Sequence, residues 1–377
     1  MKDYSVKVVC AMSGGIDSSV AAALLKRAGY NVIGVFMKFW SARQDFVRVK
    51  SGGSKPFNRC CSPEAENRAR KVAKILKIPF YVFNFEKEFK KRVVDYFLEE
   101  YRKGTTPNPC VVCNKEIKFG LLLEKAKKMG IGFLATGHYV KISNIKHQKS
   151  KIRKQKSKVI YKLLRAKDKD KDQTYFLWQL NQNQLKHILF PIGEYTKKQV
   201  KGLAKEFKLP MSGIQESQEV CFIQNTCNRF LAKYLKKNPG NIINSKEKII
   251  GRHNGLWFYT IGQRKGINIS GRKPLYVLKK DIKKNILIVT ENKKDLENKE
   301  LIVKDINWLS GKAPKLPLKI MVKVRYRACL SRAKIIKDVK SKKYKVIFDK
   351  PQRAITIGQS VVFYKGQELL GGGIIKS

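Results

Sequence analysis

Residues 7–19 read KVVCAMSGGIDSS and predict the start of an α/β fold. The segment 7–12 is a short apolar run typical of a buried strand, and an Ala- and Leu-rich helical pattern follows over residues 18–28. Between them, Gly14 and Gly15 allow the backbone to turn sharply and to approach a ligand closely. Because N–H groups point outward where a helix begins, this strand–loop–helix unit is suited to binding phosphate.

The loop differs from the two common glycine-rich phosphate loops, since it is neither G-x-G-x-x-G nor G-x-x-x-x-G-K-[ST] and no Lys follows its glycines. An ordinary turn capped by Asp17 or Ser18 is the structural alternative. The pattern S-G-G-x-D-S-S in this position resembles the PP-loop ATP pyrophosphatases, which adenylate a carbonyl oxygen and release pyrophosphate. That resemblance implies ATP and Mg²⁺, with Asp17 as a candidate metal ligand. A bound cation would neutralise charge on the leaving pyrophosphate.

Outward from this loop, the first half of the chain alternates strand and helix patterns. Such alternation favours right-handed crossovers and a parallel sheet with helices on both faces. We expect strands at 32–37, 80–85 and 133–136, and helices at 64–76, 87–101 and 115–129. From about residue 249 the pattern changes to short strands between turns, which indicates an antiparallel region and a terminal barrel. The strands expected there are 257–260, 275–278, 286–289, 320–326, 344–348 and 360–364.

Composition indicates a polyanionic partner. The 377 residues contain 81 Lys plus Arg against 29 Asp plus Glu, a formal charge of +52, and 43% apolar residues, too many for a disordered chain. The excess of Lys (63, against 18 Arg) is also what a Lys-biased proteome would produce on solvated surfaces. The sequence has neither a signal-peptide pattern at its start nor an apolar run of membrane-spanning length, so we expect a cytoplasmic protein with no membrane partner.

Eight cysteines without secretory signals favour reduced, metal-bound or catalytic thiols over structural disulfides. Residues 106–119, TPNPCVVCNKEIKF, predict a proline-braced loop that leads into a helix, with Cys113 at or near the helix start. The helix dipole and Lys115 would favour the thiolate of Cys113 there. Cys221 lies in ESQEVCFI (residues 216–223), and taken alone it is more typical of a small buried apolar residue. We assign no catalytic role to the adjacent pair Cys60 and Cys61.

Five further motifs occur in a fixed order and point to one family. They are PNPxxxCNKEIKF (107–119), GHY (137–139), KDQTYFL (171–177), SQEVCFI (217–223) and YTIGQRKG (259–266). This order resembles the tRNA-specific 2-thiouridylases over the whole chain apart from residues 141–158. The resemblance implies that ATP adenylates the 2-carbonyl of the wobble uridine of tRNA and that sulfur replaces its oxygen.

The resemblance also implies roles for single residues. Cys221 would carry the incoming sulfur as a persulfide, delivered by a sulfur-relay protein or a cysteine desulfurase, and Cys113 would be the second thiol, which releases the sulfur or resolves a disulfide bond. The residues implied to bind ATP are Ala11, Met12, Ser13, Gly14, Gly15, Ile16, Asp17, Ser18, Met37 and Gly137. Those implied to touch the target base are Asn108, Pro109 and Cys110. The implied tRNA contacts are His138, Lys171, Asp172, Gln173, Arg325, Tyr326 and Gln359. Without the resemblance, His138, Met37 and Arg325 fit ordinary structural positions equally well.

Cys110 departs from the commoner family pattern, which has Asp at this position. The change creates a Cys110-x-x-Cys113 pair, and with Cys221 it offers three thiolates that could hold a four-iron four-sulfur cluster with one iron open to sulfide. We favour the persulfide route because C-x-x-C is at least as typical of a redox pair. Two other classes are alternatives to thiolation: another PP-loop RNA-modifying enzyme, such as a lysidine-forming one, and a non-catalytic RNA-binding protein.

The resemblance divides the chain into three parts. A catalytic domain would span residues 1–228, a small linking domain 229–297, and a tRNA-binding β-barrel 298–377. Within the first part, residues 141–162 carry nine Lys or Arg and no acidic residue. This segment is typical of a solvated β-hairpin extension or a flexible insertion, and an RNA clamp is the functional alternative.

Overall fold

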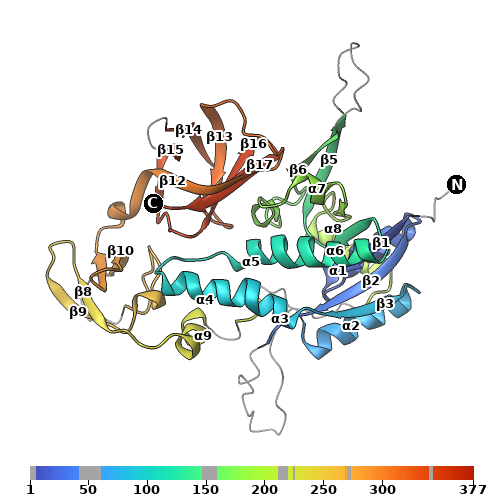
Figure 1. Ribbon diagram of the computed structural model, residues 1–377, viewed down its shortest axis with the longest axis horizontal. Coiled ribbons are helices and arrows are strands. Elements are labelled where there is room, and N and C mark those ends of the chain that lie inside the picture. Colours follow the sequence, from blue (N-terminus) through green and yellow to red (C-terminus); the bar gives the residue numbers. More distant parts are fainter. Residues whose placement is uncertain are drawn as a thin grey trace, which may run out of the picture.

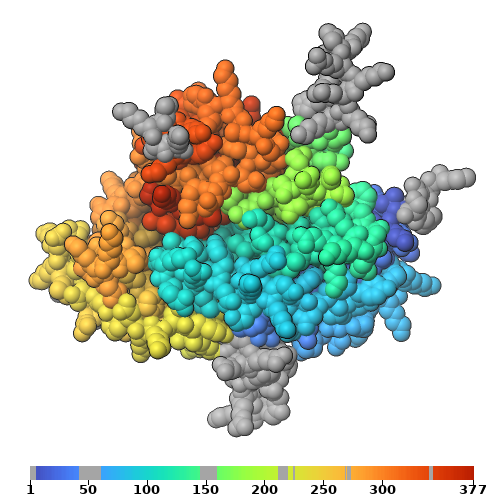
Figure 2. All heavy atoms as spheres, viewed as in Figure 1, coloured from blue at the N-terminus to red at the C-terminus, as the bar shows by residue number. Residues whose placement is uncertain are grey.

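The computed structural model describes residues 6–41, 61–146, 159–210, 220–223, 226–267, 269, 273–338 and 343–377. A parallel sheet with its helices, a small mixed sheet and a C-terminal barrel are arranged side by side, with long helices running between them (Figure 1). In the space-filling view the barrel, in orange and red, rests directly on the helical layer, in cyan and green (Figure 2).

A five-stranded parallel sheet forms the first part, as the sequence predicts. Its order is β3-β2-β1-β4-β7, with β1 (Lys7–Ala11), β2 (Asn31–Lys38), β3 (Phe80–Asn84), β4 (Phe133–Thr136) and β7 (Ile188–Leu189). Successive residues of a strand point to opposite faces, and here Val8 and Cys10 pack into one hydrophobic core while Val9 and Ala11 pack into another. The sheet is therefore buried on both faces, which explains the uninterrupted apolar run at the start of the chain.

Helices cover both faces of this sheet. α1 (Ile16–Arg27), α2 (Pro63–Ile75) and α8 (Lys197–Glu206) contribute buried residues to the core that contains Val8. On the other face a first helical run comprises α3 (Glu86–Phe89), η2 (Lys90–Val94) and α4 (Asp95–Arg102). A second run comprises α5 (Pro109–Val112), η3 (Cys113–Leu121) and α6 (Leu122–Lys128). The helices predicted in this half are confirmed, with one shift.

That shift concerns the helix expected from residue 115, which begins six residues earlier, at Pro109. Pro109 is the first helical residue, a position where its missing N–H costs nothing and its fixed φ suits the helix. The sequence interpretation treated this proline only as a brace for the preceding loop. In consequence Cys110 lies in the first turn, and Cys113 lies one turn inside the helix rather than at its start.

After helix α9 (Cys227–Tyr234) the chain forms a four-stranded sheet of order β10-β11-β8-β9. Two of its pairings are antiparallel, as expected, but β11 pairs parallel with β8, so the expectation of a wholly antiparallel region is wrong. Its strands are β8 (Gly240–Ile243), β9 (Ile249–His253), β10 (Tyr276–Asp281) and β11 (Ile286–Thr290). The strand expected at 257–260 is wrong, because the chain forms a 3₁₀ turn, Leu256–Phe258, after Gly255 at φ +147°. A short apolar run does not by itself distinguish a strand from a buried turn.

The C-terminal strands close into a barrel, as predicted. The sheet order is β12-β15-β14-β13-β16-β17-β6-β5, and an additional β12–β17 pairing closes the ring. The barrel strands are β12 (Glu297–Trp308), β13 (Leu318–Lys323), β14 (Ser331–Lys337), β15 (Tyr344–Arg353), β16 (Ser360–Lys365) and β17 (Glu368–Ile375). One side of β17 also pairs with β6 (Val159–Arg165), so the barrel shares hydrogen bonds with the first half of the chain.

The β-hairpin interpretation of the basic segment is confirmed for its described strands. β5 (Val140–Lys146) pairs antiparallel with β6 from Val140↔Arg165 to Lys146↔Val159. Residues 147–158 lie outside the described residues. Because β6 also pairs with β17, the base of this hairpin is a structural joint between the barrel and the parallel-sheet part.

Candidate functional site

The glycine-rich loop joins β1 to α1. Gly14 has φ +71°, and a Cβ atom there would lie 2.1 Å from the carbonyl oxygen of Ala65, so both conformation and space require glycine. Ser18 Oγ accepts from the Ser13 N–H at 3.1 Å and donates to the Gly15 carbonyl at 3.1 Å. In the described segment 6–41, Gly15 is the N-cap and the helix has no side-chain cap. Ser18 thus bonds within the turn, as the structural alternative expects, while the amide groups at the start of α1 keep the polarity that favours an anion.

The other residues predicted to bind ATP gather at the same edge of the sheet. Ala11 ends β1, Met37 lies near the carboxyl end of β2, and Gly137 directly follows β4. These strands are adjacent and parallel, so their carboxyl ends meet beside the loop, where the strand order reverses. Gly137 touches the first turn of α1, since a Cβ atom there would lie 2.6 Å from the Ser18 nitrogen. The fold thus brings three separate sequence segments together at one edge of the sheet.

Two residues that the sequence interpretation missed complete this edge. Lys197 Nζ lies 2.7 and 2.9 Å from the two carboxylate oxygens of Asp17, and the Tyr139 hydroxyl donates to Asp17 Oδ1 at 2.7 Å. Lys197 is the first residue of α8 and is only 9% exposed. Buried lysines are rare unless they are paired with an acidic group. The only local sequence pattern that marks Lys197 is its place directly after the N-cap Thr196 at the start of a helix. The loop has no lysine of its own, and α8 supplies one from 180 residues away.

Cys110 and Cys113 lie on one helix, three residues apart and thus on the same face. Cys113 is buried and Cys110 is half-buried. The dipole of a helix acts mainly in its first turn, so the expected dipole effect applies to Cys110 more than to Cys113. The side chain of Asn114, next to Cys113, donates to the Phe176 carbonyl at 3.2 Å and ties the helix to the segment that follows residues 171–173.

Cys221 lies in a short described segment, residues 220–223, and is half-buried. Its neighbour Phe222 is buried and makes edge-to-face or tilted ring contacts with Phe89, Phe97 and Phe230. Cys221 packs against the same hydrophobic core to which Cys113 belongs. Residues 216–219 of the predicted motif lie outside the described residues. Aromatic packing therefore anchors the position of Cys221 at the border of the core that contains Cys113.

His138 follows Gly137 and is buried, with its ring 5.8 Å from Phe119 and 6.2 Å from Phe190. Its Nδ1 is 2.7 Å from the Thr136 hydroxyl. Burial, with a smaller contribution from the Lys118 charge, holds the pKa of His138 well below its usual 6.5. His138 is therefore neutral at pH 7, and any contact it makes with RNA is a hydrogen bond or a stacking contact rather than an ion pair.

This lowered pKa predicts a pH effect on stability. Below pH 6.5 the unfolded chain binds a proton at His138 that the folded chain does not, so the free energy of unfolding falls as the pH falls. Between pH 7.5 and 5.5 the wild type should lose more stability than a His138→Gln variant, by at most about 1.4 kcal/mol, as measured by urea unfolding. His187 and His253, whose pKa values are also lowered, are present in both proteins. An equal loss in the two proteins would contradict the assignment.

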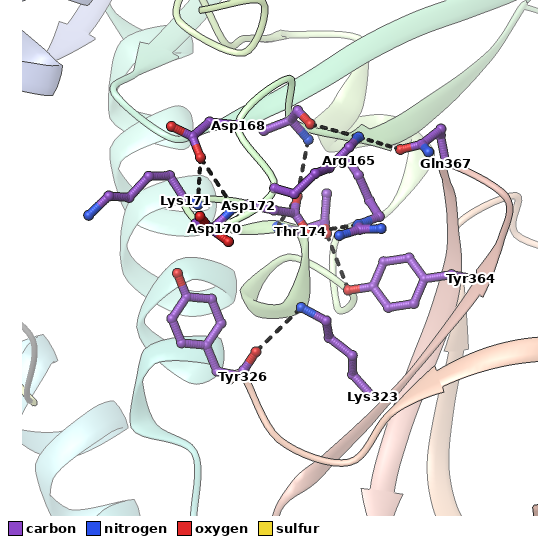
Figure 3. Close-up of polar contacts among 12 residues, drawn as sticks. Arg165, Asp168, Asp170, Lys171, Asp172, Thr174, Lys323, Tyr326, Tyr364 and Gln367 are labelled. Carbon is purple, nitrogen blue, oxygen red and sulfur yellow. Dashed lines mark hydrogen bonds and ion pairs between the residues drawn. The ribbon is translucent and has the colours of Figure 1, made fainter. Parts of the chain in front are cut away.

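Among the predicted tRNA contacts, Asp172 lies at the centre of a buried network (Figure 3). Its carboxylate accepts from the Thr174 hydroxyl at 2.8 Å, from the Ala166 N–H at 3.1 Å and from Arg165 Nε at 3.4 Å. The Thr174 hydroxyl in turn lies 3.2 Å from that of Tyr364 on the barrel. Asp172 is 2% exposed, so it holds neighbouring elements together rather than presenting a charge to solvent.

The neighbours of Asp172 are more accessible. Lys171 and Gln173 are half-buried, and Gln173 Oε1 accepts from the Tyr139 N–H at 2.9 Å. On the barrel, Arg325 is exposed, whereas the ring of Tyr326 lies 4.4 Å from that of Phe176. Figure 3 shows Tyr326 beside the helical layer, with its carbonyl accepting from Lys323 Nζ. The structure thus brings the predicted contacts of residues 171–173 and 325–326 to one junction between the barrel and the parallel-sheet part.

Comparison with known proteins supplies the family. Residues 6–225 match the model described as tRNA methyl transferase HUP domain. Residues 228–291 match tRNA methyl transferase PRC-barrel domain, and residues 298–375 match Aminomethyltransferase beta-barrel domain. The chain is 44% identical to tRNA-specific 2-thiouridylase MnmA of Clostridioides difficile (strain 630), over 98% of each chain. The chain belongs to the tRNA-specific 2-thiouridylase family.

Other relatives carry the same name. The chain is 43% identical to MnmA of Clostridium perfringens (strain ATCC 13124), over 98% of each chain, and 43% identical to MnmA of Acetivibrio thermocellus, over 98% of this chain and 99% of the relative. Among solved structures, NMN synthetase from Francisella tularensis matches with a TM-score of 0.31 at 15% identity, over 57% of this chain and 67% of that chain, a likeness too weak to support an inference. In the described ranges, none of the helices is long and apolar enough to span a membrane.

Proposed function

We propose that the protein thiolates the 2-position of the wobble uridine of tRNA in an ATP-dependent reaction. The observation that carries this proposal is the joint presence of the outward-facing start of α1 and of Cys113 and Cys221, in a chain 44% identical over 98% of its length to a named 2-thiouridylase. A lysidine-forming enzyme would not need both thiols, and a non-catalytic RNA-binding protein would not need the loop geometry.

ATP would bind with its phosphates on the loop from Ser13 to Ser18 and its base near Met37 and Gly137. The donor set fits Mg²⁺, which is usually held by one or two carboxylates together with substrate phosphates, and Asp17 provides such a carboxylate. When bound, the ion would stabilise charge on the leaving pyrophosphate. Lys197, already paired with Asp17, would add a second positive charge at the same point.

The base and the thiols would act together. Asn108, Pro109 and Cys110 would contact the splayed-out uridine, whose 2-carbonyl oxygen attacks the α-phosphorus of ATP and displaces pyrophosphate. The terminal sulfur of a Cys221 persulfide would then attack C2, and AMP would leave with the original oxygen. Attack of the Cys113 thiolate on Cys221 Sγ would free the thiolated base and leave a disulfide, which a cellular thiol reduces.

The persulfide route accords better with the thiol arrangement than an iron–sulfur cluster does. Within the part of the chain that the structure describes, which includes Cys110, Cys113 and Cys221, no three His, Cys, Asp or Glu side chains gather into a metal-binding group. As placed here, these thiols do not fit a cluster, and we route no step through one. The sulfur would come from a persulfide on a relay protein or a cysteine desulfurase.

tRNA would lie across the junction of barrel and parallel sheet, near His138, Lys171, Gln173, Arg325 and Tyr326. The net charge of +52 would supply salt-dependent backbone affinity, and the reaction would take place in the cytoplasm. We propose domain boundaries after residues 228 and 297. The hairpin of β5 and β6 belongs to the first domain and pairs with barrel strand β17.

A reconstituted reaction tests the function. The protein is purified anaerobically, its iron and sulfide are quantified, and it is incubated with ATP, Mg²⁺, unmodified tRNA and either a persulfide donor or sulfide. We expect AMP and 2-thiouridine in equal amounts from the persulfide donor, with no dependence on iron content. If neither product forms with either donor, the proposed function is wrong, and activity that follows iron content would replace the persulfide route with the cluster.

A further inference from the structure

A turn of the C-terminal barrel is hydrogen-bonded to the loop that precedes the helix of Cys110 and Cys113. Nε2 of Gln359 donates to the carbonyl oxygen of Thr106 at 3.0 Å and to that of Pro107 at 3.1 Å. The Thr106 N–H donates to the Ile357 carbonyl at 2.9 Å. Three hydrogen bonds thus join residues about 250 positions apart, immediately before Asn108.

The two segments also touch closely. Gly358, between the two bonding residues, has φ +90°, and a Cβ atom there would lie 2.9 Å from both Thr105 Cβ and the Thr106 nitrogen. The turn itself is fixed to the barrel, because the Gly358 N–H donates to the Ile375 carbonyl at 3.0 Å and the Ile375 N–H donates to the Gln359 carbonyl at 2.9 Å. The loop is therefore held by a rigid part of the barrel rather than by a free turn.

A second contact lies beside the first. The Tyr175 hydroxyl donates to the Ser360 carbonyl at 2.9 Å, and Trp178 Nε1 donates to the Ser360 hydroxyl at 3.0 Å. Tyr175 is completely buried, which raises its pKa, and hydrogen bonding to the Asn108 side chain opposes this rise. Asn108, which we propose to contact the target base, is thereby linked through Tyr175 to the same barrel turn.

The bonding of Gln359 limits what else its amide can do. A glutamine amide has two N–H donors, and both are used on the carbonyl groups of Thr106 and Pro107. Only the amide oxygen, an acceptor, remains for an external partner, and a phosphate oxygen needs a donor. In this arrangement the donors of Gln359 serve the loop before Asn108, and its oxygen remains open to a donor such as an RNA 2′-hydroxyl.

We propose that Gln359 is a positioning residue through which the barrel sets the geometry of the Thr106–Asn108 loop, and thereby of the base-binding residues and the two helix thiols. This inference rests on the proposed function and gives Gln359 a role in addition to the tRNA contact expected for it. A misplacement of about 1 Å can lower a rate by about a hundredfold without loss of binding. The barrel also carries Arg325 and Tyr326. It would therefore both bind tRNA and hold the loop that contacts the target base.

Two variants test the inference, Gln359→Ala and Gln359→Met, the second of which keeps the volume and removes the donors. With the persulfide donor present, we expect the single-turnover thiolation rate at saturating tRNA to fall about 10- to 100-fold. The Kd for tRNA is measured in parallel, because a lost tRNA contact would raise the Kd but would not lower the rate at saturating tRNA. In the tRNA-free protein, hydrogen exchange should accelerate at the amides of residues 105–112.

Gln352→Ala is the matched control. The Gln352 amide also donates to two backbone carbonyls, those of Lys350 and Pro351, but these bonds lie entirely within the barrel. It should change neither the rate nor exchange in residues 105–112. A higher Kd with an unchanged saturating rate, or unchanged exchange in both Gln359 variants, would overturn the inference. If wild-type protein thiolates no tRNA, the proposed function is wrong. The hydrogen-exchange measurement still tests separately whether Gln359 holds the loop.

Discussion

Cys221→Ser and Cys113→Ser should each lower 2-thiouridine formation by on the order of 10³-fold or more, because each removes a nucleophile for which a hydroxyl is no substitute. Pyrophosphate release should continue in both variants, since the loop from Ser13 to Ser18 and Asp17 is intact. Thiolated nucleoside is measured by mass spectrometry, and pyrophosphate is measured in the same samples. Cys329→Ser, which changes an exposed barrel cysteine, is the control and should retain full activity.

The two thiols should differ in the intermediate that each variant accumulates. Cys113→Ser should still accept labelled persulfide sulfur, whereas Cys221→Ser should not. A Cys221→Ser protein that thiolates tRNA at the wild-type rate would refute the role given to this residue. Loss of pyrophosphate release in either variant would place that thiol in adenylation instead of sulfur transfer.

Cys110→Asp separates the persulfide route from the cluster within the same assay. The substitution introduces the residue that is commoner in the family, and it removes one of the three thiols that a cluster would need. Under the persulfide route the variant should keep activity within about threefold of wild type, because only Cys113 and Cys221 handle sulfur. A loss as large as that of Cys113→Ser would contradict this route.

Lys197→Met should lower the rate of AMP formation by about 10²–10³-fold, the usual cost of removing a group that stabilises charge in the transition state. Lys197 Nζ lies 2.7 Å from Asp17 at the start of α1, and the loop carries no lysine to replace it. The measurement is single-turnover release of AMP and pyrophosphate at saturating ATP. Lys198→Met, one residue further along α8 and exposed, is the matched control.

Removing Lys197 also leaves a partly buried carboxylate without its cation, so stability must be measured separately. The variant should remain folded, with a normal circular dichroism spectrum at the assay temperature, and the rate should fall even where unfolding is absent. If the rate of AMP formation is unchanged in the folded variant, Lys197 is only a structural partner of Asp17. A raised KM for ATP with unchanged kcat would limit its role to substrate binding.

Local sequence patterns predicted the elements whose cause is local. The apolar run before Gly14 formed β1, and the alternation of strands and helices formed the parallel sheet. Errors arose where a pattern had two readings. Pro109 starts a helix as readily as it braces a loop, and the apolar residues at 257–260 form a turn after Gly255. The helix that contains Cys113 therefore begins six residues earlier than expected. Cys110, and not Cys113, lies in its first turn, where the helix dipole acts most strongly.

The sequence by itself identified the family, the glycine-rich loop and the two candidate thiols, because each depends on residue types at short spacing or on motifs in order. Only the tertiary structure decided the partners of those residues. Lys197 reaches Asp17 across 180 positions, and Gln359 bonds to Thr106 across 253. Contacts at such separations depend on how the strands assemble into a sheet and how the barrel packs against the parallel-sheet part. Neither contact produces a periodic pattern in the sequence.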